Sequence, residues 1–109
     1  MAKIKKKNIF IVSDATGDTA SHVLNAAMRQ FPKNIIKVSY FRKVSDPEQI
    51  KKIVEKAERK KALLVYTFVY EKTRQFISEL SRKKNVLSVD VLGNAIDAIA
   101  EHLGVYTGS

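Results

Sequence analysis

The sequence has 109 residues, of which 45% are hydrophobic and 28% are charged, and it contains no cysteine. A chain of this length and composition can bury one hydrophobic core without disulfide bonds. The lack of cysteine excludes a disulfide framework, a thiolate metal site and a thiol nucleophile, and it fits a cytoplasmic location.

Neither a metal site nor a membrane segment is predicted. The two histidines, His22 and His102, lie far apart and show no ligand spacing. No apolar run approaches the roughly 20 residues of a membrane span. The basic start MAKIKKK is followed by an apolar run that is too short for the core of a signal peptide.

Positive charge is distributed unevenly along the chain. The formal net charge is +9, all 20 Lys and Arg residues precede residue 85, and three of the 11 acidic residues follow it. Such a field could attract a nucleic acid, a nucleotide or an acidic protein. The basic residues fall mostly on expected helix faces and helix ends, without exposed aromatic residues between them for base stacking. We therefore expect a solvated lysine-rich surface rather than a nucleic-acid partner.

The first structural unit follows a basic N-terminal segment, residues 1–7. A strand is expected at residues 8–12, and a hydroxyl-rich turn, Ser13 to Thr19, leads into a helix. The apolar residues of that helix recur at helical spacing and predict one buried face: Ala20, Val23, Leu24, Ala27 and Phe31. Pro32 ends the helix.

The second unit begins with a strand at residues 35–41, which mixes apolar and polar residues as strands near a sheet edge do. A helix start follows, with Asp46 as N-cap, Pro47 at the first helical position and Gln49 at the third. The predicted buried face of this helix consists of Ile50, Ile53, Val54 and Ala57.

The second half of the chain continues the alternation. A strand at residues 62–67 is apolar on both faces and belongs in the sheet interior. Phe76, Ile77 and Leu80 mark a helix, and residues 86–89 form a short fourth strand. The last helix ends at Gly104, and its apolar face consists of Leu92, Ile96, Ile99 and Leu103. We assign residues 8–104 to one α/β domain and residues 105–109 to a tail or chain boundary.

Strands that alternate with helices of this length imply right-handed crossovers and a parallel sheet. The predicted fold class is α/β: a small three-layer domain with about four parallel strands, flavodoxin-like or Rossmann-like. Ligands of such sheets lie beyond the carboxyl ends of the strands, near the point where strand order reverses. The polar residues expected at those ends are Ser13, Asp14, Thr16, Gly17, Arg42, Lys43, Thr67 and Asp90.

The loop after the first strand is the strongest candidate for a phosphate site. Unpaired backbone N–H groups at a helix N-terminus favour anions, hydroxyls add donors, and glycine allows a tight turn. The candidate residues are Ser13, Asp14, Thr16, Gly17 and Thr19, with Thr67 and Asp90 as secondary candidates.

Structural roles explain the same residues. Thr16 or Asp18 would cap the helix without any ligand. Asp14 would either orient a hydroxyl or a metal-bound water, or brace the loop. Asp90 would serve only as the cap of the last helix.

Known phosphate motifs narrow the interpretation of this loop. It is not a Walker A motif, because no Lys-Ser or Lys-Thr pair follows Gly17, and it lacks the three glycines of G-x-G-x-x-G. The segment from Thr16 to Thr19 resembles the T-G-x-T loop of flavodoxins. An alternative function is therefore a flavodoxin-like module that holds FMN or a phosphate compound, although core packing explains the aromatic candidates Tyr66 and Phe68 equally well.

A longer resemblance covers nearly the whole chain, from about Ile9 to Gly104. Three segments carry it: IVSDATGDTASHVLNAAMRQF, VYTFV and VDVLGNAIDAIAEHLG. They are similar to the amino-terminal part of the family of pyruvate, phosphate dikinase regulatory proteins and phosphoenolpyruvate synthase regulatory proteins. The chain differs in having Ala15 where the family usually has Ser and Asp18 where Glu is common.

The resemblance implies a bifunctional kinase and phosphorylase. A full-length member phosphorylates a threonine of the dikinase or synthase with ADP, and removes that phosphate with inorganic phosphate, which releases pyrophosphate. The family's nucleotide loop, G-x-S-R-x-x-K-T-P, belongs to the carboxyl-terminal half and has no match in this sequence. The resemblance therefore predicts an amino-terminal domain that lacks the nucleotide-binding domain, holds no cofactor and is inactive alone. The resemblance assigns no catalytic residue to this chain, and it does not decide whether the protein forms a homodimer.

Overall fold

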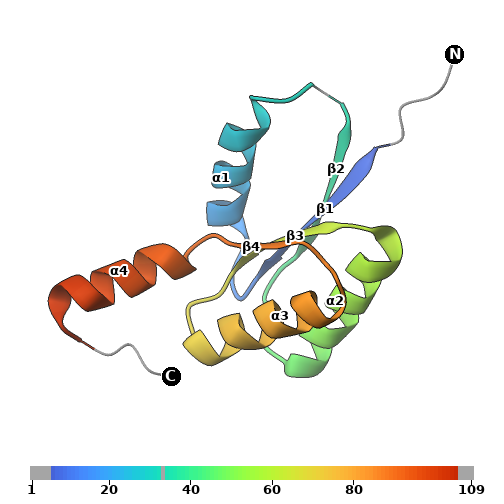
Figure 1. The fold of residues 1–109 in the computed structure, drawn as a ribbon. Helices are drawn as coiled ribbons and strands as arrows, with labels where there is room; N and C mark the ends of the chain where they lie inside the picture. Colours follow the sequence, from blue (N-terminus) through green and yellow to red (C-terminus); the bar gives the residue numbers. More distant parts are fainter. Residues whose placement is uncertain (1–5, 33, 106–109) are drawn as a thin grey trace, which may run out of the picture.

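The computed structural model describes residues 6–32 and 34–105. The parts of the predicted N-terminal segment and tail at residues 1–5 and 106–109 lie outside this description. Strands and helices alternate along the chain (Figure 1). The strands are β1 (Lys7–Ser13), β2 (Ile36–Phe41), β3 (Leu63–Thr67) and β4 (Ser88–Asp90). The helices are α1 (Asp18–Met28), α2 (Pro47–Lys60), α3 (Glu71–Lys83) and α4 (Gly93–Leu103).

All four strands form one parallel sheet in the order β2-β1-β3-β4. Ile11 pairs with Tyr40 of β2 on one side and with Val65 of β3 on the other. The predictions of a parallel α/β domain, an interior third strand and an edge second strand are confirmed. Since the chain passes from β1 to β2 at one side and from β3 to β4 at the other, strand order reverses between β1 and β3.

The larger core lies between the sheet and the helices α2 and α3. Phe10, Val12 and Leu64 of the sheet face this side and are at most 1% exposed. The predicted face of α2 is confirmed, because Ile50, Ile53, Val54 and Ala57 are all buried there. The helix starts as predicted: Asp46 and Gln49 form a reciprocal capping box, with Pro47 in the first turn.

The opposite face of the sheet is covered by α1, which buries Ala20 and Leu24 against Ile9, Ile11 and Val65. The predicted buried face of α1 is only partly correct. Val23 is 50% exposed and Phe31, which lies beyond the end of the helix, is 59% exposed; Ala27 is also exposed. Among residues 6–32 and 34–105, no second helix packs beside the outer part of this apolar stripe.

The apolar face predicted for α4 is buried only in part, because Leu92 and Ile96 are half-buried and the two residues that follow them on this face are not. Ile99 and Leu103 are 57% and 63% exposed, and Figure 1 shows α4 extending away from the sheet. The N-terminal turns of α4 are held near α3 by ion pairs described below, whereas the apolar residues of its C-terminal turns remain largely exposed.

The last strand starts later than predicted, at Ser88 rather than at residue 86. The reason lies at the end of α3, where the Val86 N–H donates to the Ser81 carbonyl at 2.8 Å and closes the helix. Val86 is therefore a buried helix-terminating residue, and the ladder with β3 begins only at the Leu87 carbonyl, which accepts from the Leu64 N–H at 2.9 Å.

Candidate functional site

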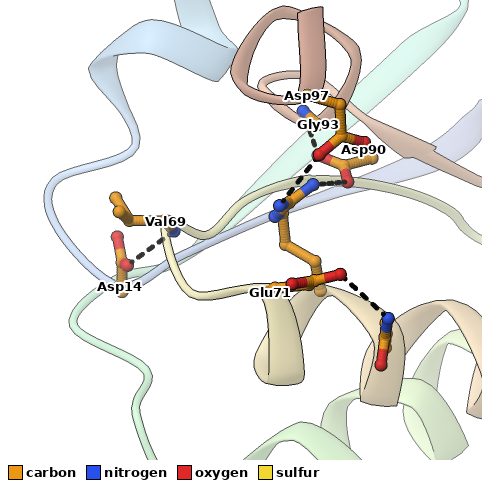
Figure 2. Close-up of polar contacts among 8 residues, drawn as sticks. Asp14, Val69, Glu71, Asp90, Gly93 and Asp97 are labelled. Atoms are coloured by element: carbon orange, nitrogen blue, oxygen red, sulfur yellow. Dashed lines mark hydrogen bonds and ion pairs between the residues drawn. The ribbon is translucent and has the colours of Figure 1, made fainter. Parts of the chain in front are cut away.

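The point where strand order reverses is flanked by two loops, residues 13–17 after β1 and residues 67–70 after β3. Asp14 joins them. Its N–H donates to the Thr67 carbonyl at 3.4 Å, and its Oδ2 accepts from the Val69 N–H at 3.2 Å (Figure 2). Asp14 thus acts as a brace between the loops at the carboxyl edge of the sheet, and Thr67, only 4% exposed, contributes its backbone.

The hydroxyls of the first loop serve its own backbone. Ser13 is 2% exposed, and its Oγ accepts from the Ala15 N–H at 3.0 Å. The Thr16 Oγ1 accepts from the Asp18 N–H at 3.3 Å, at the start of α1. Thr19 lies exposed in the first turn of α1. Of the three hydroxyl candidates, Thr19 is the one whose side chain faces solvent without a role in shaping the loop.

Gly17 occupies a position that no other residue fits without strain. Its φ is +86°, in the left-handed region, and it directly precedes α1. A Cβ there would lie 3.3 Å from Ile11 Cγ2 and 3.5 Å from Tyr40 Cδ2. Conformation and close packing therefore both require glycine at the start of this helix.

Arg42 is a site residue that the sequence analysis placed only at a strand end. Its Nε donates to the Thr16 carbonyl at 2.8 Å, and its guanidinium lies 4.3 Å from the centroid of the Tyr40 ring. The Tyr40 hydroxyl in turn lies 2.8 Å from Ser21 Oγ on α1. The only sign of this role in the sequence was the position of a basic residue directly after β2. The contact itself forms because β2 pairs with β1, which places Arg42 beside the loop that follows β1.

The charges around the loop determine which ligand it suits. The first-turn N–H groups of α1 have no acceptor within the helix and form its positive end. Asp18 adds a negative charge to that turn, and Arg42 adds a positive charge beside it. Backbone donors, Thr19 and Arg42 together can hold a small oxyanion. In the described residues, no group of three or more His, Cys, Asp or Glu side chains could hold a metal ion.

A second polar cluster forms where α3, β4 and α4 meet. The side chain of Arg74 is 7% exposed, with Nη1 3.6 Å from Asp90 Oδ2 and Nη2 3.5 Å from Asp97 Oδ1 (Figure 2). Asp90 Oδ1 also accepts from the Gly93 N–H at 2.8 Å. Asp90 therefore both pairs with Arg74 and satisfies the first N–H of α4, the capping role considered for it above.

Gly93 is required by this second cluster. A Cβ at Gly93 would overlap the Asp90 carboxylate and lie 3.0 Å from Arg74 Nη1. A polar hollow of about 470 Å³ adjoins the cluster and reaches Tyr66 and Ser78. Burial raises the pKa of the Tyr66 hydroxyl, and the Asp90 carboxylate raises it further.

The structure separates the primary candidates from Asp90. In Figure 2, Asp14 and Val69 lie together at the left of the view, whereas Asp90, Gly93 and Asp97 lie together away from them. The aromatic residues considered for a flavin belong to the core: Tyr66 and Phe68 are 3% and 1% exposed. The loop at the switch point and the cluster around Arg74 are thus two distinct sites.

The fold is that of a parallel α/β domain with a polar loop at its switch point, and comparison with known proteins supplies the family. The family described as Kinase/pyrophosphorylase matches residues 9–108. The chain belongs to this family. In the part of it that the structure describes, no helix combines the length and the apolar character needed to cross a membrane.

Individual relatives are similar over most of this chain. A protein of Halothermothrix orenii named "Putative pyruvate, phosphate dikinase regulatory protein" is 35% identical over 97 residues, which is 89% of this chain and 36% of the relative. A protein of Syntrophomonas wolfei with the same name and the number 2 is 37% identical over 90 residues, 83% of this chain and 33% of the relative. Pyruvate, phosphate dikinase regulatory protein 1, chloroplastic, of Arabidopsis thaliana is 32% identical over 104 residues, 90% of this chain and 26% of the relative. The chain thus spans about a third of the length of its bacterial relatives.

Proposed function

We propose that this chain serves as the amino-terminal domain of a regulatory kinase and phosphorylase whose protein substrate is pyruvate, phosphate dikinase or phosphoenolpyruvate synthase. The observation that carries the proposal is the family match over residues 9–108, which includes the switch-point loop. The names of the relatives, pyruvate, phosphate dikinase regulatory proteins, support the dikinase as target.

The proposed reaction transfers a phosphoryl group in both directions. In the kinase direction, the threonine Oγ of the target attacks the β-phosphorus of ADP, the bond to the α-phosphate oxygen breaks, and AMP leaves while the hydroxyl proton is lost. In the phosphorylase direction, an oxygen of inorganic phosphate attacks the phosphothreonine, and pyrophosphate and the free hydroxyl form. Both directions place a transferred phosphoryl group beside a second phosphate, so oxyanion donors are needed.

Within this scheme, the switch-point loop is proposed to form one wall of the phosphate site or to dock the target. The first-turn N–H groups near Thr19 and the Arg42 guanidinium are the proposed donors, and Gly17 provides the left-handed turn that leads into α1. Asp14 holds the loop in place through the Val69 N–H. Because the sequence holds no G-x-S-R-x-x-K-T-P loop, we expect the chain alone to neither phosphorylate a dikinase with ADP nor release pyrophosphate.

A chimera tests the proposal. Residues 9–104 replace the matching segment of the Halothermothrix orenii relative, and transfer of phosphate from labelled ADP to the dikinase is measured. We expect the chimera to be active and its Gly17→Val variant to lose most of that activity. Gly104→Val is the matched control, since Gly104 also has positive φ, at +66°, but an added Cβ meets nothing within 4 Å. An inactive chimera that is folded would contradict the proposed function.

Phosphate titration of this chain tests the loop separately. Phosphate or pyrophosphate at millimolar concentration should shift the amide resonances of Thr16 to Thr19 first. A diffuse effect of the +9 charge would instead spread over the lysine-rich helices and disappear in added neutral salt. Gly17→Val should abolish the local shifts and Gly104→Val should keep them. Equal titrations of parent and Gly17→Val would show that the loop is only a helix start.

A further inference from the structure

The polar hollow beside Arg74, of about 470 Å³, has the size of a small-molecule site; such sites measure about 300–1,000 Å³. Six charged side chains line it: Glu71, Arg74, Glu79, Arg82, Asp90 and Asp97. Carboxylates outnumber guanidiniums there by four to two, whereas the whole chain has a formal net charge of +9. A small molecule that prefers this hollow must therefore suit a local charge opposite to that of the chain.

The Arg74 guanidinium is buried without a full set of acceptors. The residue is 6% exposed, and among residues 6–32 and 34–105 its Nε has no hydrogen-bond partner. The other two nitrogens have distant partners, since Nη1 lies 3.6 Å from Asp90 Oδ2 and Nη2 lies 3.5 Å from Asp97 Oδ1. Hydrogen bonds between charged groups are usually about 2.7–2.9 Å long. A buried donor without an acceptor costs free energy, so the chain itself satisfies this guanidinium incompletely.

The unpaired Nε and the loosely paired Nη2 belong to one edge of the guanidinium. Their N–H groups point in the same direction, and together they fit the two oxygens of a carboxylate. Asp97 pairs with Nη2, and its side chain is 67% exposed. An exposed carboxylate exchanges one cation for another at little cost. A ligand carboxylate can therefore replace Asp97 on Nη2 and also supply the acceptor that Nε lacks.

We propose that this hollow binds a basic α-amino acid, lysine or arginine, with its carboxylate on the Nε and Nη2 edge of Arg74. The α-ammonium group pairs with Asp97, which the ligand carboxylate displaces from Arg74. The side-chain cation lies toward Glu79, an exposed lining residue, and balances the surplus of carboxylates. The ligand thereby joins Arg74 of α3 to Asp97 of α4. The site is separate from the switch-point loop, so the inference does not depend on the proposed phosphate site.

Titration of the isotope-labelled chain with L-lysine, at constant pH and ionic strength, tests the site through the Arg74 Nε–H resonance. The variant Arg74→Lys lacks this resonance and so identifies it. We expect L-lysine at millimolar concentration to shift the resonance, because the Nε–H gains an acceptor. Lysinamide, which lacks the carboxylate, and Nα-acetyl-lysine, which lacks the α-ammonium group, should each bind at least about tenfold more weakly. A resonance that L-lysine leaves in place, or equal binding of the three compounds, would overturn the proposal.

The order of amino acids distinguishes a local site from the diffuse field of the chain. The net charge of +9 attracts glutamate more strongly than lysine. The lining of the hollow has the opposite preference, because carboxylates are in excess there. We expect the affinity measured at the Arg74 Nε–H to fall from lysine to alanine to glutamate. The reverse order would show the general field alone and would overturn the proposal.

Two matched variants test the side-chain contact while Asp90 and Asp97 stay in place. Glu79→Gln removes one charge from the lining, and Glu58→Gln removes the same charge from the exposed face of α2, outside the hollow. We expect Glu79→Gln to weaken lysine several-fold and to leave alanine unchanged, and Glu58→Gln to change neither. Circular dichroism checks that both variants fold. Equal effects of the two variants on lysine would contradict the proposed position of the ligand.

Discussion

On one face of the sheet, α2 and α3 enclose Phe10, Val12 and Leu64 almost completely. On the other face, α1 alone covers Ile11 and Val65 and leaves a groove beside them. The same two central strands supply both faces, and their apolar residues alternate between them. The difference therefore comes from the number of helices on each side, which determines how much an equally apolar strand contributes to stability.

Leu64→Ala should have the largest effect among the substitutions considered. Leu64 lies on β3 and is 0% exposed, because its side chain packs in the core under α2 and α3. The substitution therefore leaves a closed cavity. We expect a loss of about 2–4 kcal/mol in the free energy of unfolding. Urea denaturation followed by circular dichroism measures it, and unchanged stability would mean that β3 is not an interior strand.

A matched valine pair sharpens the comparison between the faces. Val12 lies in the enclosed core at 0% exposed, whereas Val65 lies at the groove at 4% exposed. We expect Val65→Ala to cost about 1.5 kcal/mol, the transfer contribution of two methyl groups, and Val12→Ala to cost about 1 kcal/mol more because a closed cavity remains. Equal losses in urea denaturation would indicate that the two faces are packed equally well.

Asp14→Ala tests the contact between the loops after β1 and β3, at the carboxyl edge of the sheet. The variant loses the bond from the Val69 N–H to the carboxylate, and we expect a loss of about 1 kcal/mol. Asp18→Ala removes the same charge from the first turn of α1, next to the loop, and is expected to affect only the interaction with the helix dipole, about 0.5 kcal/mol. Thermal unfolding of both variants compares them, and a smaller loss for Asp14→Ala than for Asp18→Ala would contradict a bracing role.

The smallest expected effect is the loss of folding stability at alkaline pH that is due to Tyr66. Burial, and then Asp90, raises the pKa of Tyr66 above its ordinary value of 10.0. Above about pH 10, the unfolded chain loses this proton while the folded chain retains it, so the unfolded state binds fewer protons and stability falls as pH rises. Tyr66→Phe should lose less stability than the parent between neutral pH and pH above 10. Identical slopes in urea denaturation would show that Tyr66 ionises equally in both states.

Local patterns predicted the enclosed face well. The buried stripe from Ile50 to Ala57 and the cap residues Asp46 and Gln49 are features of one helix, and the structure has them as predicted. They depend on interactions within a few residues of the chain, which the sequence displays directly. The interior position of β3 was also predictable, because a strand apolar on both faces needs cover on both sides.

The site was predicted only in part, and the missing part consists of contacts between distant segments. Gly17 and the hydroxyl-rich loop were visible as a motif. The bond from Arg42 to Thr16 and the brace from Asp14 to Val69 join residues 26 and 55 positions apart. No local spacing encodes such contacts; they follow from the order of strands in the sheet.

The sequence by itself determined the alternation of strands and helices, the family and the position of the glycine turn, because each depends on local periodicity or on a contiguous motif. Only the tertiary structure decided which apolar stripes are buried. Val23 and Ile99 follow helical periodicity as well as Val54 does, yet they remain at least half exposed. Periodicity shows that a helix has an apolar face, whereas burial requires a second surface at the right place, and only the packing of the whole chain determines that.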